Sequence, residues 1–170
     1  MSISLAIFTL FHVAISLIAI ASGFVIAYGF LTSQRFDRSN ATFLIFTVAT
    51  SLTGFLFPYH GFTPAIGLGI LSIVVLAIAI FSRYAKKMAG ASRWIYVVTA
   101  MIAFYFNFFV LVVQSFMKIP ALHDLAPTQT EPPFKITQLA VLLIFAAVTI
   151  ASAVKFHTNP QMPAGEIATT

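Results

Sequence analysis

Residues 95–117 read IYVVTAMIAFYFNFFVLVVQSFM, and this stretch decides the class of fold. It contains no Asp, Glu, Lys or Arg, and the nearest charges are Arg93 and Lys118, just outside it. Hydrocarbon offers no water to backbone N–H and C=O groups, so a spanning segment must be a helix or part of a closed barrel. The stretch lacks the alternating pattern of a barrel strand and is too long for one. It therefore predicts a transmembrane helix, which needs about 20 residues.

Four further apolar runs of this kind occur in the chain. All of its nine basic and four acidic residues lie outside the five runs, and only 8% of the sequence is charged. A soluble domain carries about 25%. We therefore expect an all-α fold, an integral membrane bundle of five transmembrane helices forming a single domain over 1–157, with a flexible tail at 158–170. The other four runs cover residues 5–31, 41–57, 65–81 and 136–154.

Several classes of protein are disfavoured by composition. The absence of cysteine excludes disulfides and thiolate metal ligands. The basic residues lie at helix ends and form no stripe, which argues against a nucleic-acid partner. Residues 1–34 carry no charge and so lack the basic region of a signal peptide. We expect the first run to be a retained helix.

Basic residues are divided unequally between the two predicted sides of the membrane. Seven fall on the side of the C-terminus and two on the other side. The positive-inside rule then predicts an outside N-terminus and an inside C-terminus. The inner set is Arg35, Arg38, Arg83, Lys86, Lys87, Arg93 and Lys155, and the outer set is Lys118 and Lys135.

Between the second and third runs, Pro58, Gly61 and Pro64 interrupt any helix and predict an outer turn at 58–64. A re-entrant hairpin over 41–81 is the alternative, and it would have to be buried in protein.

Small and polar residues recur at helical spacing on one face of each predicted helix. Helices associate in lipid where small residues allow close approach and where side chains hydrogen-bond. We expect these faces to form the bundle interior. In the order of the five runs, the faces consist of His12, Ser16, Ala19, Gly23 and Ala27; of Thr47, Thr50, Ser51 and Gly54; of Ala65, Gly69 and Ser72; of Ala100, Ala103, Asn107, Gln114 and Lys118; and of Ala140, Ala147 and Ala151.

No predicted helix interior contains a charged residue. Proton relays and ion-coupled carriers usually place such residues inside the bundle, so a pump or ion-coupled transporter is not expected. A narrow pore for a neutral solute, lined by Thr47, Thr50, Ser51 and Asn107, stays open as an alternative.

Polar residues that could bind a ligand gather toward the outer side. The candidate cofactor-binding residues are His12, His60, Asn107 and Gln114. His12 and His60 could be axial ligands of a haem, and together with His123 they could hold a metal. His12 and Gln114 could instead hydrogen-bond a quinone or lipid. In the plainest interpretation His12 bonds a neighbouring helix, and the sequence favours no cofactor over the others.

Asn107 lies in the middle of the fourth run, where a primary amide must find a partner. That partner is predicted to be a Thr or Ser of the second helix, or Ser16 or Ser22 of the first. The alternative is that Asn107 orients a ligand.

The linker after the fourth run contains Lys118, His123 and Asp124, which we regard as candidate residues of a lid or partner site. The linker also holds apolar residues that a solvated loop would not need. They could fold the segment back over the mouth of the bundle, present it to a partner, or leave it as a loop at the membrane surface. These residues are Ile119, Leu122, Leu125 and Phe134.

Several segments resemble a family of small multi-pass inner-membrane proteins from proteobacteria that has no known activity. The resemblance covers most of the chain up to the tail. It implies a bacterial inner membrane and assigns no functional residue. The segments are FVLVVQSF at 109–116 followed by Lys118, PAL at 120–122, APT at 126–128, EPPF at 131–134, TGF at 53–55, FP at 57–58 and GFTPA at 61–65.

The expected function is therefore that of a small non-enzymatic subunit or binding module. It would pack with itself or with a larger membrane complex in the lipid bilayer and hold a lipid- or quinone-like ligand near the outer leaflet. A histidine-ligated haem or metal protein and a neutral pore are the alternatives. No motif combines a nucleophile, a base and an orienting group, so an enzyme is not expected.

Overall fold

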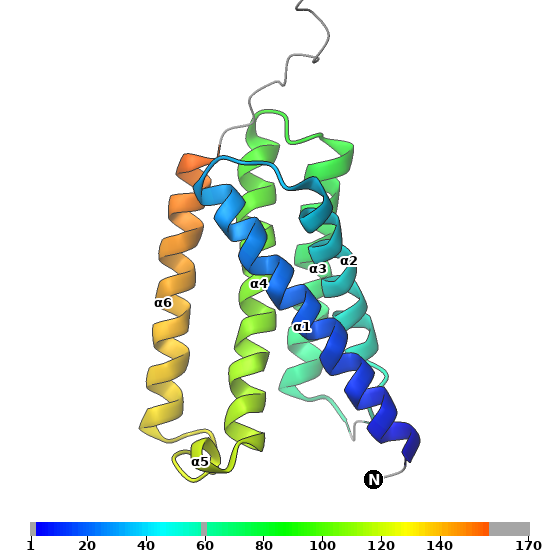
Figure 1. Ribbon diagram of the computed structural model, residues 1–170, viewed down its shortest axis with the longest axis vertical. Coiled ribbons are helices and arrows are strands. Elements are labelled where there is room, and N and C mark those ends of the chain that lie inside the picture. Colours follow the sequence, from blue (N-terminus) through cyan, green and yellow to red (C-terminus); the bar gives the residue numbers. More distant parts are fainter. Residues whose placement is uncertain (1–2, 59–60, 157–170) are drawn as a thin grey trace, which may run out of the picture.

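The computed structural model describes residues 3–58 and 61–156, and its regular structure is helical (Figure 1). No strand occurs within these residues, so the all-α prediction is confirmed. The helices are α1 (Ile3–Leu31), α2 (Asp37–Gly54), α3 (Pro64–Ile80), α4 (Ala91–Lys118), α5 (Pro120–His123) and α6 (Pro132–Lys155). A π-helical turn, η1 (Phe81–Ala85), continues α3.

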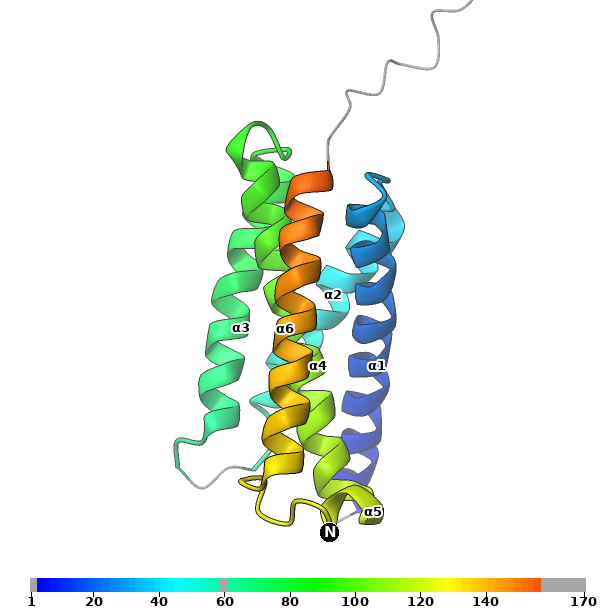
Figure 2. The ribbon, with the colours of Figure 1, turned by 90° about the vertical axis from the view of Figure 1, so that its left-hand side faces the viewer.

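The long helices run alternately up and down, with α4 in contact with α1, α2, α3 and α6 (Figures 1 and 2). Helix α1 packs on α2 and crosses α4 obliquely, so that its C-terminal end approaches α6 (Figure 1). There the rings of Phe30 and Phe156 lie 5.0 Å apart. Because α1 is tilted, it contacts both α2 at one edge of the bundle and α6 at the other.

Four of the described helices are long and apolar enough to cross a membrane, namely α1, α3 with η1, α4 and α6. They indicate a multi-pass membrane bundle. Helix α2 differs because its first turn consists of Asp37, Arg38, Ser39 and Asn40. It begins at Asp37 and not at residue 41 as predicted, since the helix continues into polar sequence.

The junction between α2 and α3 follows from its sequence. Thr63 caps α3, because its Oγ1 accepts a hydrogen bond from the Ile66 N–H at 3.3 Å. Pro64 occupies the first turn, where a missing N–H costs nothing. Gly61 has a φ of 84°, which favours glycine. The predicted turn is confirmed at its described residues, and His60 lies outside them.

An aromatic cluster around Phe104 of α4 forms the centre of the bundle. Its ring meets those of Phe24, Phe43 and Phe145 edge-on, with centroids 5.1, 6.2 and 4.9 Å apart. Helix α1 can approach this cluster because Gly23 has no side chain, and a Cβ there would lie 2.5 Å from the Phe104 ring. The close approach predicted for small residues is therefore realised at Gly23.

The interior faces predicted for the first three helices are mostly confirmed. Ala19 of α1 and Thr47 of α2 are fully buried. On α3, Gly69 packs so closely on Phe55 that a Cβ would lie 2.9 Å from its ring, whereas Ala65 is exposed. The small residues predicted to face the interior thus lie at helix contacts on these three helices, except for Ala65.

The predicted faces of α4 and α6 are only partly right. Gln114 and Lys118, at the end of α4, are exposed. On α6 the prediction was wrong for Ala140 and Ala147, which are exposed, whereas Ala151 is half-buried and Phe145 belongs to the core. Helix α6 lies at the edge of the bundle, where a bulky ring is needed to fill the space beside α4 and α1.

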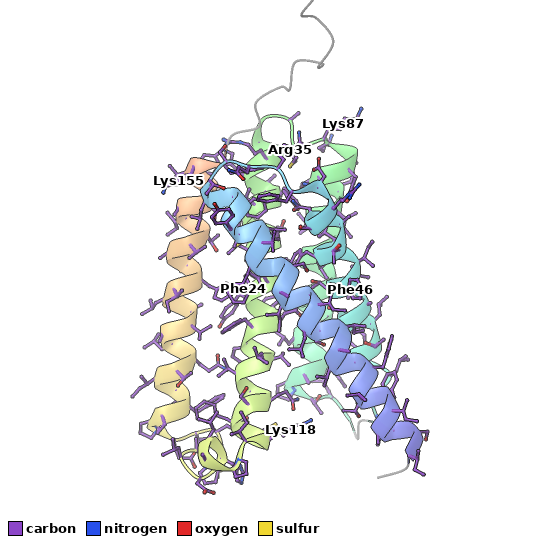
Figure 3. The ribbon with its side chains drawn as sticks, viewed as in Figure 1. Phe24, Arg35, Phe46, Lys87, Lys118 and Lys155 are labelled. Carbon is purple, nitrogen blue, oxygen red and sulfur yellow. The ribbon has the colours of Figure 1, made fainter. Side chains whose placement is uncertain are left out.

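Charged side chains gather at the two ends of the bundle. Figure 3 shows Arg35, Lys87 and Lys155 at one end and Lys118 at the other. This division matches the two sides predicted from the sequence. We call the end with Arg35, Lys87 and Lys155 the inner end, and the opposite end the outer end.

Candidate functional site

His12 of α1 is hydrogen-bonded to α2 near the outer end. Its Nδ1 lies 2.8 Å from Thr53 Oγ1, and its ring meets Phe57 edge-on at 5.1 Å. The Thr53 hydroxyl also lies 2.7 Å from the Ala49 carbonyl, to which it can donate within its own helix. The interpretation that His12 bonds a neighbouring helix is confirmed.

Asn107 also finds its partner on α2. Its Nδ2 donates to Thr47 Oγ1 at 3.2 Å, which confirms the predicted bond to the second helix. Ser51 and Ser72 lie 3.0 Å apart and join α2 to α3. The Thr50 hydroxyl is buried with no partner in the described part of the chain. Three of the four residues suggested for a pore are thus hydrogen-bonded between helices, and Thr50 is not.

The three candidate cofactor residues that the structure describes, His12, Asn107 and Gln114, share no hydrogen bond or ring contact with one another. Gln114 is exposed on α4, and among the described residues no hydrogen bond or ring contact links it to His12. Asn107 is held by α2, as described above. Residues 3–58 and 61–156 contain no group of three His, Cys, Asp or Glu that could hold a metal. His60, the second residue suggested for haem and metal binding, lies outside the described residues.

The linker between α4 and α6 folds back onto these same two helices. Ala126 is fully buried against Val112 and Phe116 of α4. Gln129 Nε2 donates to the Val113 carbonyl at 3.1 Å. Leu122 and Phe134 of the linker pack with Ala126 on this part of α4 and form a small second core. Ile119 and Leu125 are exposed, so the linker covers only the end of the α4–α6 hairpin and not the whole bundle.

The residues suggested for a lid or partner site, Lys118, His123 and Asp124, are exposed around this linker. His123 lines a groove of about 260 Å³. The other residues that line the groove are Met117, Pro127, Thr128 and Gln129. Lys118 and Asp124 do not line it.

Glu131 closes the linker just before α6. Its carboxylate accepts hydrogen bonds from the Thr128 hydroxyl at 2.7 Å, the Thr128 N–H at 3.2 Å and the Thr130 N–H at 3.0 Å. These donors, the Thr128 hydroxyl first, lower the pKa of Glu131 from its ordinary value of 4.5. The ionised carboxylate therefore stabilises the linker turn.

A buried arginine at the inner end was missed by the sequence analysis. Arg83 lies on η1 and is 8% exposed. Its Nη2 lies 2.5 Å from Asp37 Oδ1 and its Nη1 lies 3.8 Å from Met88 Sδ. The guanidinium also lies over the Tyr96 ring, 5.1 Å from its centroid. A cation–π contact and an ion pair together compensate for burying the charge.

Tyr96 extends this arrangement to α2. Its hydroxyl donates a short hydrogen bond to Asn40 Oδ1, and Asn40 Nδ2 donates to the Phe36 carbonyl at 3.0 Å. Both Tyr96 and Asn40 are buried. We call Asp37, Asn40, Arg83, Met88 and Tyr96 the Arg83 cluster. It holds α2, η1 and α4 together, and its one exposed acceptor is Asp37.

One signal in the sequence could have revealed the Arg83 cluster. Asp37 is the only acidic residue in the inner loops predicted from the sequence, where all other charges are basic. An isolated carboxylate among cations indicates a specific ion pair. The sequence does not say that the partner is Arg83, 46 positions away.

Comparison of the chain with family models, with curated proteins and with solved structures found no match.

Proposed function

We propose that this protein is a non-enzymatic membrane protein with five spans, which packs with itself or with a larger complex in the bacterial inner membrane. The assignment to a bacterial inner membrane rests on the resemblance stated for the sequence. The proposed role rests on how the helices use their polar and small residues.

The fifth span is assigned to α2. With 18 residues it is about 27 Å long, close to the hydrocarbon thickness of about 30 Å. It runs from the inner end, where α1 finishes, to the outer end, where α3 begins (Figure 1). The basic residues gathered at the inner end favour a cytoplasmic position for that end, with the N-terminus outside.

The non-enzymatic role is supported by the polar pairs inside the bundle. His12 bonds Thr53, and Asn107 bonds Thr47. These contacts join α1 and α4 to α2, so both side chains are engaged between helices. Polar side chains in the bundle thus serve helix packing.

The observation that carries the proposal is the outward face of α6. Ala140 and Ala147 lie on it, two turns apart, and both are exposed. Of the described helices, α6 contacts α4 and α1. Small residues in membrane helices favour close approach of another helix, so this face is suited to a second copy or another subunit.

The test is the state of assembly of the protein extracted from its native membrane in mild detergent. Native mass spectrometry and cross-linking in the membrane are expected to show a discrete homo-oligomer or a co-purified subunit. Ala147→Phe should dissociate it, because a bulky ring prevents close helix approach. Ala77→Phe is the matched control, since Ala77 is exposed on α3.

A wild-type protein that is monomeric, with no co-purified chain, would contradict the proposal. An assembly that tolerates Ala147→Phe as well as Ala77→Phe would place the interface away from α6.

A further inference from the structure

A groove of about 350 Å³ lies between α1 and α2. Its α1 side is one helical face that is partly open to the surroundings, since Ile18 and Val25 are 42% and 40% exposed. Its α2 side is the first turn and a half of that helix, at the inner end. The lining residues are Ile18, Ala21, Ser22 and Val25 of α1, and Arg38, Ser39 and Thr42 of α2.

The two ends of this groove differ in chemistry. Along the axis of α1, Val25 lies about 9 Å from the helix end at Leu31, and Ile18 lies about 20 Å from it. Arg38 lies in the first turn of α2, at the inner end of the bundle. The groove thus combines an apolar wall with a cation at its rim.

The side chains of Arg38 and Ser39 both have hydrogen-bond donors that are not used within the described part of the protein. Within the described part of the chain, no hydrogen bond or ion pair engages the guanidinium of Arg38 or the hydroxyl of Ser39. The other arginines nearby are engaged, because Arg35 and Arg83 both pair with Asp37. A guanidinium fits phosphate oxygens in a bidentate manner.

We propose that this groove binds an anionic phospholipid. The phosphate accepts hydrogen bonds from Arg38 and Ser39, and one acyl chain lies along Ile18, Ala21 and Val25. The volume lies at the lower end of the range for ligand pockets, about 300–1,000 Å³. It holds the phosphate region and the first part of one chain.

A lipid fits this groove better than a soluble anion or an acidic peptide does. Most of the lining is apolar and belongs to α1, a helix long and apolar enough to cross a membrane. Bilayer lipid is the molecule that surrounds such a face. The inference deepens the proposed function and rests on its membrane insertion, but not on which end faces the cytoplasm.

Lipid retention by the reconstituted full chain tests the inference. The protein is placed in nanodiscs of equal parts phosphatidylglycerol and phosphatidylcholine, and native mass spectrometry counts the lipids that stay bound. Wild type is expected to retain phosphatidylglycerol preferentially. Arg38→Gln should reduce that preference about fivefold, since each basic residue near the surface contributes about 1 kcal/mol.

Lys87→Gln is the matched control, because it removes a charge of the same sign from the same end (Figure 3). It should leave retention unchanged. Ala21→Leu keeps all charges and fills the groove, and since Ala21 is exposed the helix can carry the larger side chain. It should also lower retention.

Equal retention by Arg38→Gln and Lys87→Gln would overturn the inference, as would displacement of the lipid by millimolar inorganic phosphate. The same spectra report the state of assembly. An intact oligomer without lipid preference overturns this inference alone, whereas a monomer that still prefers phosphatidylglycerol overturns the proposed assembly and supports the groove.

Discussion

Among single residues, Gly23 makes the closest helix contact near the core. The Phe104 ring that it touches is enclosed by other rings and cannot move aside. Gly23→Ala is therefore expected to destabilise the protein by about 1–3 kcal/mol through overpacking. Thermal or denaturant unfolding of the detergent-solubilised protein measures this loss.

Gly54→Ala is the control, since a Cβ there would lie 3.9 Å from His12 Cε1, an ordinary contact. It should be neutral or stabilise the helix by up to about 1 kcal/mol. Equal effects of the two substitutions would show that Gly23 does not set the distance between α1 and α4.

Hydrogen-bond partners could be predicted for polar side chains that lie within the hydrocarbon, because no water is available to them there. An imidazole or amide in a membrane needs a neighbour, and both His12 and Asn107 were expected to bond another helix. For Arg83 no protein partner was required by this argument. A cation at a helix end is ordinarily solvated by water and headgroups. The isolated Asp37 indicates an ion pair but does not identify Arg83 among the basic residues nearby.

Among the elements, η1 and α2 are tied to each other by the Arg83–Asp37 pair. Asp37→Asn leaves a buried guanidinium facing a neutral acceptor. We expect a loss of about 1–3 kcal/mol, the range for hydrogen bonds to charged groups, reduced by the 67% exposure of the Asp37 side chain. The midpoint of thermal unfolding should fall.

Asp124→Asn serves for comparison, because Asp124 is exposed in the linker. It removes the same charge and should leave the midpoint unchanged. If both variants unfold at the same temperature as wild type, the pair does not stabilise the inner end.

The linker before α6 is expected to respond to acid. The folded pKa of Glu131 is depressed, so its stabilising effect is complete above the ordinary pKa and is lost as the pH falls through the folded value. Hydrogen exchange of residues 124–131, relative to its intrinsic rate, should therefore accelerate as the pH falls below the ordinary pKa of a glutamate. Glu131→Gln should exchange fast at every pH, and an unchanged pH profile in that variant would refute the role of the carboxylate.

Helix positions were more predictable than helix faces or ends. Long apolar runs located every long helix, because hydropathy reports directly on lipid contact. It does not report on a helix that continues into polar sequence, which is why the start of α2 at Asp37 was missed. Hydropathy also does not distinguish a row of small residues that packs inside the bundle from one that packs on another chain, as we propose for α6.

For the whole molecule, the number of spans depends on α2. The sequence lacks cysteine, so single cysteines can be labelled selectively. Phe62→Cys and Gln34→Cys place thiols at exposed positions beyond the two ends of α2. In intact spheroplasts an impermeant maleimide should label residue 62 at once, and residue 34 only after permeabilisation.

Labelling of both positions from the same side would reduce the count to four spans. It would also reverse the sidedness of α3, α4 and α6 relative to α1. Labelling of residue 34 alone would invert the whole bundle and place the Arg83 cluster outside.

The length and oblique course of α1 lead us to expect that the protein responds to bilayer thickness. Its 29 residues are about 44 Å long, well beyond the hydrocarbon of about 30 Å, and such a helix adapts by changing its tilt. With Gly23 against Phe104 as the pivot, a thinner bilayer would rotate α1 and move Val25 relative to α2. Lipids of different chain length would then change the tilt of α1, and the groove between α1 and α2 beside Arg38 would become wider or narrower.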